Sequence, residues 1–351
     1  MEVTQSVSRE RKHTNITSSR FGRGCARGIG KELSRFLVCS MEIPWNLTKA
    51  LLQAEPVHVV MVDTLEENII EKQVKAAPAC DCVVGIGGGQ AIDLAKFFAW
   101  KLSVRLVTIP TVISVDAFVT AAAAIRRDHK IVYVGATSPD PLVIDYDLIR
   151  TAPAELNIAG VGDLLSIHTA TYDWEIAERY KHSEFPFSQE SVAKARSILK
   201  SHILDKECEI KSLSDEGLQT IIDGYIEINT ICLPAGHYRV EEGSEHYIFY
   251  ELESRLQRSF VHGHIVGLGV YLMSKLQNNE SDAILTFMNN VGLRYQPKQM
   301  ELTKADVIHS LKNLQQFIQA QKDLWFTVIN VEEITDEWIA TAIAKLEFNH
   351  D

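Results

Sequence analysis

The sequence predicts an α/β N-terminal domain with a Rossmann-like parallel sheet, followed by an all-α C-terminal domain. Up to about residue 150, short apolar runs alternate with helix-length amphipathic segments, which is typical of parallel sheets. One apolar run, 83–86, leads into three consecutive glycines and then directly into a helical pattern. From Pro153 onward, long helical periods replace the β-branched runs. A chain of 351 residues accommodates two domains, and we expect them to cover 1–150 and 151–351.

The elements of the first half can be predicted in order. Residues 1–18 are polar and predict a loosely attached arm. Residues 20–24 predict a turn, and 29–36 a short helix. Strands are expected at 36–39, 57–62, 82–86, 106–110 and 142–144, helices at 44–53, 65–76 and from 90 onward, and a hairpin at 124–134 that closes on Asp128 and His129.

The glycine-rich turn is the first candidate binding element. Gly87, Gly88 and Gly89 connect a buried strand to a helix, so a ligand can approach bare backbone at a helix N-terminus. This arrangement favours a pyrophosphate. A strict G-x-G-x-x-G is not met, because Gln90 occupies its sixth position, and no Gly-Lys-Ser/Thr follows. A turn whose glycines serve only packing is the alternative interpretation.

A second loop is expected at the same edge of the sheet. Pro110 to Ser114 follows the next predicted strand, and ligands of parallel sheets bind at the carboxyl ends of the strands. This coincidence favours a dinucleotide. Asp63 follows the 57–62 strand, and a carboxylate there would repel a 2′-phosphate, which favours NAD over NADP.

Composition narrows the class of partner. The net charge of -11 and a pI near 5.6 argue against nucleic acid, whose phosphates would be repelled. No apolar run is long enough for a membrane span, and the N-terminus lacks the apolar core of a signal peptide. The six cysteines have no framework or paired-ligand spacing, which suits a reducing, cytoplasmic location.

Three segments of the helical half carry metal-ligand chemistry. Asp163 follows Gly160 and Gly162 at the expected start of a helix, His246 lies in a predicted first turn opened by Ser244, and His262 begins a glycine-rich helix. One carboxylate and two imidazoles suit Zn²⁺ or Fe²⁺ and leave positions open for a substrate oxygen. Taken singly, Asp163 is more simply a helix cap, and each histidine an ordinary polar residue.

The ordered motifs resemble those of the metal-dependent (iron-containing) alcohol dehydrogenase and dehydroquinate-synthase superfamily. The matching stretches are Gly87-Gly88-Gly89-x-x-x-Asp93, Pro110-Thr111-x-x-Ser114-x-Asp116, Gly160-x-Gly162-Asp163, Gly243-Ser244-Glu245-His246 and His262-Gly263. Together with Asp173-Trp174, they are most similar to the sn-glycerol-1-phosphate dehydrogenase and AraM-type branch. The resemblance covers about residues 20–290. It implies a dehydroquinate-synthase-like fold with NAD(P) and a metal in a cleft, and homo-oligomers.

The resemblance also assigns roles to individual residues. Asp163, His246 and His262 match metal ligands that serve catalysis, with zinc expected and iron or nickel as alternatives; Asp163 is also expected to contact substrate. Asp116 and Tyr250 match substrate contacts, although the glycerol-phosphate enzymes have histidine where this chain has Tyr250. The cofactor-binding set is Gly87, Gly88, Gly89, Gln90, Asp93, Thr111, Ser114 and Thr120.

The activity implied is NAD(P)-linked reduction of a small polyol phosphate, most simply dihydroxyacetone phosphate to sn-glycerol 1-phosphate. The alternatives are a polyol dehydrogenase without phosphate specificity, a dehydroquinate-synthase-like sugar-phosphate cyclase, and a regulatory descendant without activity. The cyclases typically have glutamate where this chain has Asp163. In the dehydrogenase, the metal would polarise the substrate carbonyl as hydride arrives from the nicotinamide.

Overall fold

The structure is a computed structural model that describes residues 16, 18–128, 130–321 and 323–349. The chain divides into two compact units, Met1–Asn157 and Ile158–Asp351. The observed division therefore lies several residues beyond the boundary expected near residue 150. The expected N-terminal arm lies almost entirely outside the described residues.

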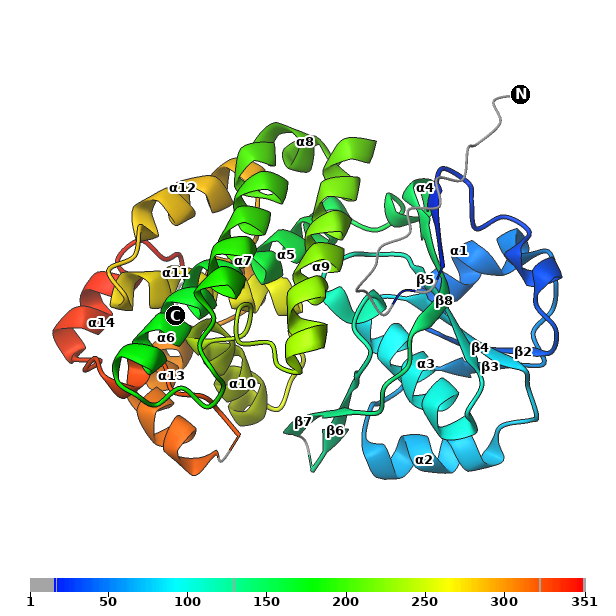
Figure 1. The fold of residues 1–351 in the computed structure, drawn as a ribbon, viewed down its shortest axis with the longest axis horizontal. Helices are drawn as coiled ribbons and strands as arrows, with labels where there is room; N and C mark the ends of the chain where they lie inside the picture. Colours follow the sequence, from blue (N-terminus) through cyan, green and yellow to red (C-terminus); the bar gives the residue numbers. More distant parts are fainter. Residues whose placement is uncertain (1–15, 17, 129, 322, 350–351) are drawn as a thin grey trace. The chain divides into compact units, whose positions relative to one another are not determined.

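The first unit is built on a six-stranded sheet with the order β1-β8-β5-β4-β2-β3 (Figure 1). All neighbouring strands in it run parallel, which confirms the predicted parallel α/β fold. The strands are β1 (Ser19–Gly22), β2 (Phe36–Ser40), β3 (His58–Met61), β4 (Cys82–Gly87), β5 (Arg105–Pro110) and β8 (Pro139–Asp145).

Helices cover both faces of this sheet. Consecutive strand residues point to opposite sides, and because the strands are apolar on both sides, each face has to be buried. Leu37 and Val83 pack against the helices α2 and α3 and the hairpin on one face. Val38 and Val84 pack against α1, α4 and a 3-10 turn on the other face. The elements around the sheet are α1 (Glu42–Leu52), α2 (Glu67–Ala76), α3 (Gly89–Leu102), α4 (Tyr146–Ile149) and the antiparallel hairpin β6 (Ala123–Arg127) and β7 (Lys130–Val134).

Two predictions near the N-terminus were only partly right. Residues 20–24 were expected to form a turn, but the turn begins at residue 23, because Ser19–Gly22 is the edge strand β1, which pairs with β8. Its residues are exposed or half-buried, so it lacks the apolar run that marks a central strand. Residues 29–36 were expected to be helical, but only Ile29–Glu32 forms a 3-10 turn, and β2 begins at Phe36.

The second unit is helical, as predicted. Its helices are α5 (Ala154–Leu164, which begins in the first unit), α6 (Ser166–Arg179), α7 (Gln189–His202), α8 (Glu207–Ser212), α9 (Asp215–Ala235), α10 (Ser244–Leu256), α11 (His262–Leu276), α12 (Ser281–Val291), α13 (Lys304–Ala320) and α14 (Asp336–Ile343). Short 3-10 turns lie at Leu204–Lys206, Pro297–Met300 and Val328–Asn330. Among the described residues, no helix is long and apolar enough to cross a bilayer.

Helices α5 and α11 cross at backbone contact distance. A Cβ atom on Gly162 would lie 1.9 Å from the carbonyl oxygen of Gly263, and one on Gly263 would lie 1.7 Å from that of Ala159. Real Cβ atoms never come this close to backbone, so only glycine fits at both positions. Gly162, which directly precedes Asp163, therefore serves helix packing.

Gly263→Ala is expected to lower the free energy of unfolding by about 3 kcal/mol or more, because the new methyl group meets backbone that cannot move aside. Urea denaturation of the purified variant measures the loss. Gly224→Ala in α9 is the matched control, since its methyl would meet side-chain atoms and no backbone: the flexible end of Leu164 at 3.0 Å and the Cβ of His202 at 3.6 Å. Equal stability losses in the two variants would contradict the tight crossing.

Candidate functional site

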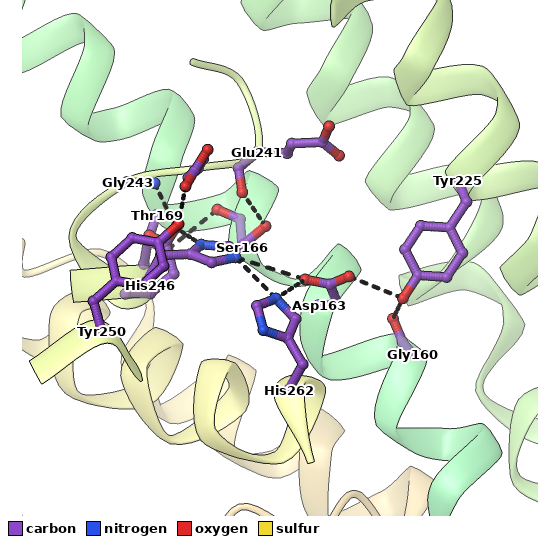
Figure 2. Close-up of polar contacts among 12 residues, drawn as sticks. Gly160, Asp163, Ser166, Thr169, Tyr225, Glu241, Gly243, His246, Tyr250 and His262 are labelled. Atoms are coloured by element: carbon purple, nitrogen blue, oxygen red, sulfur yellow. Dashed lines mark hydrogen bonds and ion pairs between the residues drawn. The ribbon is translucent and has the colours of Figure 1, made fainter. Parts of the chain in front are cut away.

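The second unit brings Asp163, His246 and His262 together, as Figure 2 shows. Asp163 Oδ1 lies 3.0 Å from His262 Nε2 and 3.7 Å from His246 Nε2. The two Nε2 atoms are 3.3 Å apart, and the three candidate ligand atoms all lie within 4.8 Å of one another. Three residues from separate helices therefore face a common point.

Each helix delivers its residue from a different position. His262 is the first residue of α11, and His246 lies in the first turn of α10. Asp163 was expected at the start of a helix, with a helix cap as its simpler interpretation, but it lies in the last turn of α5. That prediction was wrong because Gly160 and Gly162 resemble a helix break although they lie within α5.

Glu245 fixes the orientation of His246. Its side chain is fully buried, and its Oε1 accepts hydrogen bonds from His246 Nδ1 at 2.8 Å and from the Gly243 amide at 2.6 Å. The other oxygen accepts one from Thr169 Oγ1 at 2.6 Å. Because Nδ1 then carries the ring proton, the lone pair of Nε2 points toward Asp163 and His262.

Tyr225 and Asp173 support the site from behind. The Tyr225 hydroxyl lies 3.1 Å from Asp163 Oδ2 and 3.0 Å from the Gly160 carbonyl, so Oδ1 is the carboxylate oxygen left facing the imidazoles. Asp173 accepts a 2.8 Å hydrogen bond from the Ser244 amide at the start of α10. Ser244 was expected to cap this helix, but Gly243 occupies the N-cap, and the carboxylate of Asp173 bonds the first amide instead.

Sequence reasoning did not identify Glu245 or Tyr225 as site residues. Glu245 had a signal, since it immediately precedes His246, and a metal-bound histidine commonly donates its second ring N–H to a carboxylate. Tyr225 had no signal, because it lies 62 residues from Asp163 within a long apolar helix.

The pKa shifts follow from these contacts. Burial would raise the pKa of Asp163, but the adjacent His262 and His246 prevail and hold it below its usual range. Burial likewise disfavours the charged form of His246, yet its hydrogen bonds with Asp163 and Glu245 raise its pKa well above the ordinary value. Burial, followed by the nearby charge of Glu245, raises the pKa of Asp173 to about 6.

The cluster fits a divalent cation. It offers two imidazole nitrogens and one carboxylate oxygen, the donor set of catalytic zinc and related metals. The two buried carboxylates of Asp163 and Glu245 would balance a charge of +2 when the imidazoles are neutral. His262 is the most exposed of the three candidate ligands, with 19% of its side chain exposed, so one side remains open.

In the first unit, the glycine turn lies at the carboxyl end of β4, as predicted. Gly88 is the N-cap of α3, and Gly87 has φ of +144°. A Cβ on Gly88 would lie 2.9 Å from Val112, and one on Gly89 would lie 2.7 Å from Val115. The glycines are therefore required by the loop that follows β5, and binding of a dinucleotide here stays a prediction.

A buried lysine connects two predicted cofactor residues. Lys96 Nζ lies 2.8 Å from Asp93 Oδ1, and it donates to Thr120 Oγ1 at 3.2 Å and to the Ala122 carbonyl at 2.6 Å. Both charged side chains are buried. Lys96 therefore ties α3 to the end of the loop that carries the other predicted residues of the set, and Asp93 acts on that loop through Lys96.

The other predicted residues lie in the following places. Thr111 is buried and donates its amide to the Gly87 carbonyl at 3.0 Å, while Ser114 and Asp116 are half-buried in the same loop. Gln90 lies in the first turn of α3 and is exposed. Tyr250 lies one turn after His246 on α10, and its hydroxyl donates to Glu242.

The sheet order weakens the argument for NAD over NADP. Asp63 follows β3, which is separated from β4 by β2. The strand that lies next to β4 on this side is thus β2, which ends at Ser40, and the Ser40 hydroxyl donates to the Ile86 carbonyl at 2.8 Å. The sequence could not reveal this order, because the β2 and β3 segments have similar apolar patterns and either could pair with β4.

Comparisons with known proteins found a matching family model and several similar sequences. A family model described as iron-containing alcohol dehydrogenase matches residues 38–153. The glycerol-1-phosphate dehydrogenase (NAD(P)+) of Hyperthermus butylicus is 28% identical over 70% of this chain and 69% of its own. That of Pyrococcus horikoshii is 27% identical over 80% of this chain and 77% of its own.

Solved structures share the fold over nearly the whole chain. A probable glycerol dehydrogenase from Sinorhizobium meliloti has a TM-score of 0.71 at 20% identity, covering 93% of this chain and 96% of its own. An iron-containing alcohol dehydrogenase from Corynebacterium glutamicum has a TM-score of 0.69 at 14% identity, covering 98% of both chains. These likenesses confirm the predicted two-part fold.

Residues 38–153 are thus similar to iron-containing alcohol dehydrogenases, and the whole chain shares the fold of one of them. The two relatives named above, which are similar to it over 70% and 80% of its length, are both glycerol-1-phosphate dehydrogenases.

Glu245→Gln is expected to weaken binding of Zn²⁺ by about 10- to 100-fold, because the amide no longer offers two anionic acceptors to its three donors. Competition with a chromogenic chelator measures the affinity. Glu253→Gln, later on the same helix, is the control. Equal affinities in wild type and Glu245→Gln would show that Glu245 does not support the ion.

Asp173 is expected to make stability depend on pH. The folded protein holds this proton more tightly than the unfolded chain, where the pKa is near 3.8. Its contribution to the free energy of unfolding is therefore complete below pH 3.8 and is lost as the pH rises through about 6, a change of about 3 kcal/mol.

Urea unfolding of metal-free wild type and Asp173→Asn between pH 3.5 and 7 isolates this contribution. The stability of the wild type relative to the variant should fall across the range. A difference that stays constant with pH would mean that Asp173 keeps its ordinary pKa.

Proposed function

We propose that this protein is a metal-dependent, NAD(P)-linked dehydrogenase that reduces dihydroxyacetone phosphate to sn-glycerol 1-phosphate. The observation that carries the proposal is the convergence of Asp163, His246 and His262 within 4.8 Å. The names of the relatives, glycerol-1-phosphate dehydrogenase (NAD(P)+), support the substrate and the coenzyme.

The proposed ligands are Asp163 Oδ1 and the Nε2 atoms of His246 and His262, with zinc as the best match to this donor set and iron or nickel as alternatives. An ion bound there would supply Lewis acidity toward a ketone oxygen. The chain's own contribution is orientation. Tyr225 holds the carboxylate, and Glu245 holds the imidazole of His246, so the donors need little rearrangement.

The proposed coenzyme site is the glycine turn with Gln90, Thr111 and Ser114. The free N–H groups at the start of α3 suit a pyrophosphate, and bound NAD(P)H would supply the hydride. Lys96 would keep Thr120 and the loop after β5 in place. Either coenzyme is compatible with Ser40 at the end of β2, because a hydroxyl does not repel a 2′-phosphate.

Asp116 is proposed to contact the substrate, and it lies in the same loop as Thr111 and Ser114. A homo-oligomer and a cytoplasmic location belong to the same proposal. The location is supported by the cysteines, all of which are free in the described part of the chain.

The purified protein with Zn²⁺ is expected to oxidise NADH or NADPH steadily when dihydroxyacetone phosphate is added. Chelation should abolish the activity, and Zn²⁺ should restore it. His262→Ala should reduce kcat/KM by about 100-fold or more, because it removes a metal ligand. His309→Ala, an exposed histidine on α13, is the control and should retain activity.

Metal-loaded protein that oxidises neither coenzyme with dihydroxyacetone phosphate or dihydroxyacetone would overturn the proposal. A cyclase of the dehydroquinate-synthase type would instead release phosphate from a heptulosonate-like substrate without net change in the coenzyme. Parallel phosphate and absorbance assays separate the two activities.

A further inference from the structure

The cluster of Asp163, His246 and His262 has buried residues on one side and partly exposed residues on another. The supporting residues Glu245, Thr169 and Asp173 are completely buried. In contrast, Tyr250 and Glu242 are only half-buried, like His262. A substrate that places an oxygen on the cluster must therefore approach from the side where Tyr250, Glu242 and His262 are accessible.

Tyr250 and Glu242 form a bonded pair beside the cluster. The ring of Tyr250 lies 6.3 Å from that of His246, one turn earlier on α10, and Figure 2 shows the two side chains together. The Tyr250 hydroxyl donates to Glu242 Oε1, which fixes the carboxylate in place. The charge of Glu242 is close enough to contribute to the raised pKa of His246.

A carboxylate at this position distinguishes the two ends of the proposed substrate. The ketone of dihydroxyacetone phosphate lies between a free hydroxymethyl group and a phosphate ester. A carboxylate accepts a hydrogen bond from a hydroxyl, but it repels a phosphate dianion. Within the described part of the chain, the hydrogen bond to the Glu242 side chain comes from Tyr250 and reaches Oε1, so Oε2 can accept one from a substrate hydroxyl.

We propose that Glu242, held by Tyr250, recognises the free hydroxyl end of the substrate and directs the phosphate to the opposite side of the cluster. This inference rests on the proposed function and deepens it, because it assigns an orientation to the ketone. It also gives Tyr250 a function in a place where a positively charged histidine would favour a phosphate.

The test compares two ketones that differ in one hydroxyl, dihydroxyacetone phosphate and hydroxyacetone phosphate. For the wild type, we expect kcat/KM to be about 10- to 100-fold higher with the first, since only it offers a hydroxyl to Glu242. Glu242→Ala should bring this ratio close to one, through loss of activity with dihydroxyacetone phosphate alone. Tyr250→Phe should lower the ratio in the same direction.

Glu241→Ala is the matched control. It removes the same charge one residue away, but the Glu241 side chain bonds Cys232 and points away from His246 in Figure 2. Its ratio should equal that of the wild type. Metal content and unfolding temperature are measured for each variant, and Tyr250→Phe carries the test if Glu242→Ala does not fold.

The outcomes are distinct. If the phosphate end faced the pair, Glu242→Ala would raise kcat/KM for both ketones by the same factor and leave the ratio unchanged, which would overturn the inference alone. Wild-type protein that reduces neither ketone would overturn the proposed function and this inference with it. Calorimetric binding of sn-glycerol 1-phosphate should weaken about 10-fold in Glu242→Ala and not in Glu241→Ala.

Discussion

The contacts of the Asp163 carboxylate with the imidazoles of His246 and His262 are the interaction on which the candidate site depends. A buried carboxylate is costly without partners, and here His262 and His246 supply them while Tyr225 satisfies the second oxygen. The position of this carboxylate requires α5 and α11 to touch, which Gly162 and Gly263 allow. The close packing of these two helices thus determines whether Asp163 lies beside His262, where the two can share an ion.

Two further buried carboxylates, those of Glu245 and Asp173, lie behind the cluster. Glu245 bonds the far nitrogen of His246, and Asp173 lies behind it at the start of α10, where the amides of a helix N-terminus stabilise a carboxylate. Burial, followed by the nearby charge of Glu245, raises the pKa of Asp173 to about 6. This region of the protein is therefore organised to hold positive charge, whether as protons or as a bound cation.

In the first unit, the predicted coenzyme site consists mainly of backbone, and the contacts around it keep that backbone in place. The glycines after β4 let the loop after β5 lie against α3, and Lys96 ties the end of that loop to the same helix. The buried pair of Lys96 and Asp93 keeps both charges compensated. The groups available to a ligand here are the backbone amides at the start of α3 and the hydroxyls of the loop after β5. Such groups suit a common coenzyme more than a particular substrate.

The sequence alone determined the parallel sheet, the helical second half and the three candidate ligands, because apolar periodicity and ordered motifs are local signals. It misplaced Asp163 at a helix start, since a glycine that allows helix crossing and a glycine that breaks a helix look alike in sequence. It could not place β2 beside β4, nor find Tyr225 and Glu242 as partners of site residues. Strand order and contacts between distant or exposed side chains arise only when the chain packs, so only the tertiary structure decided them.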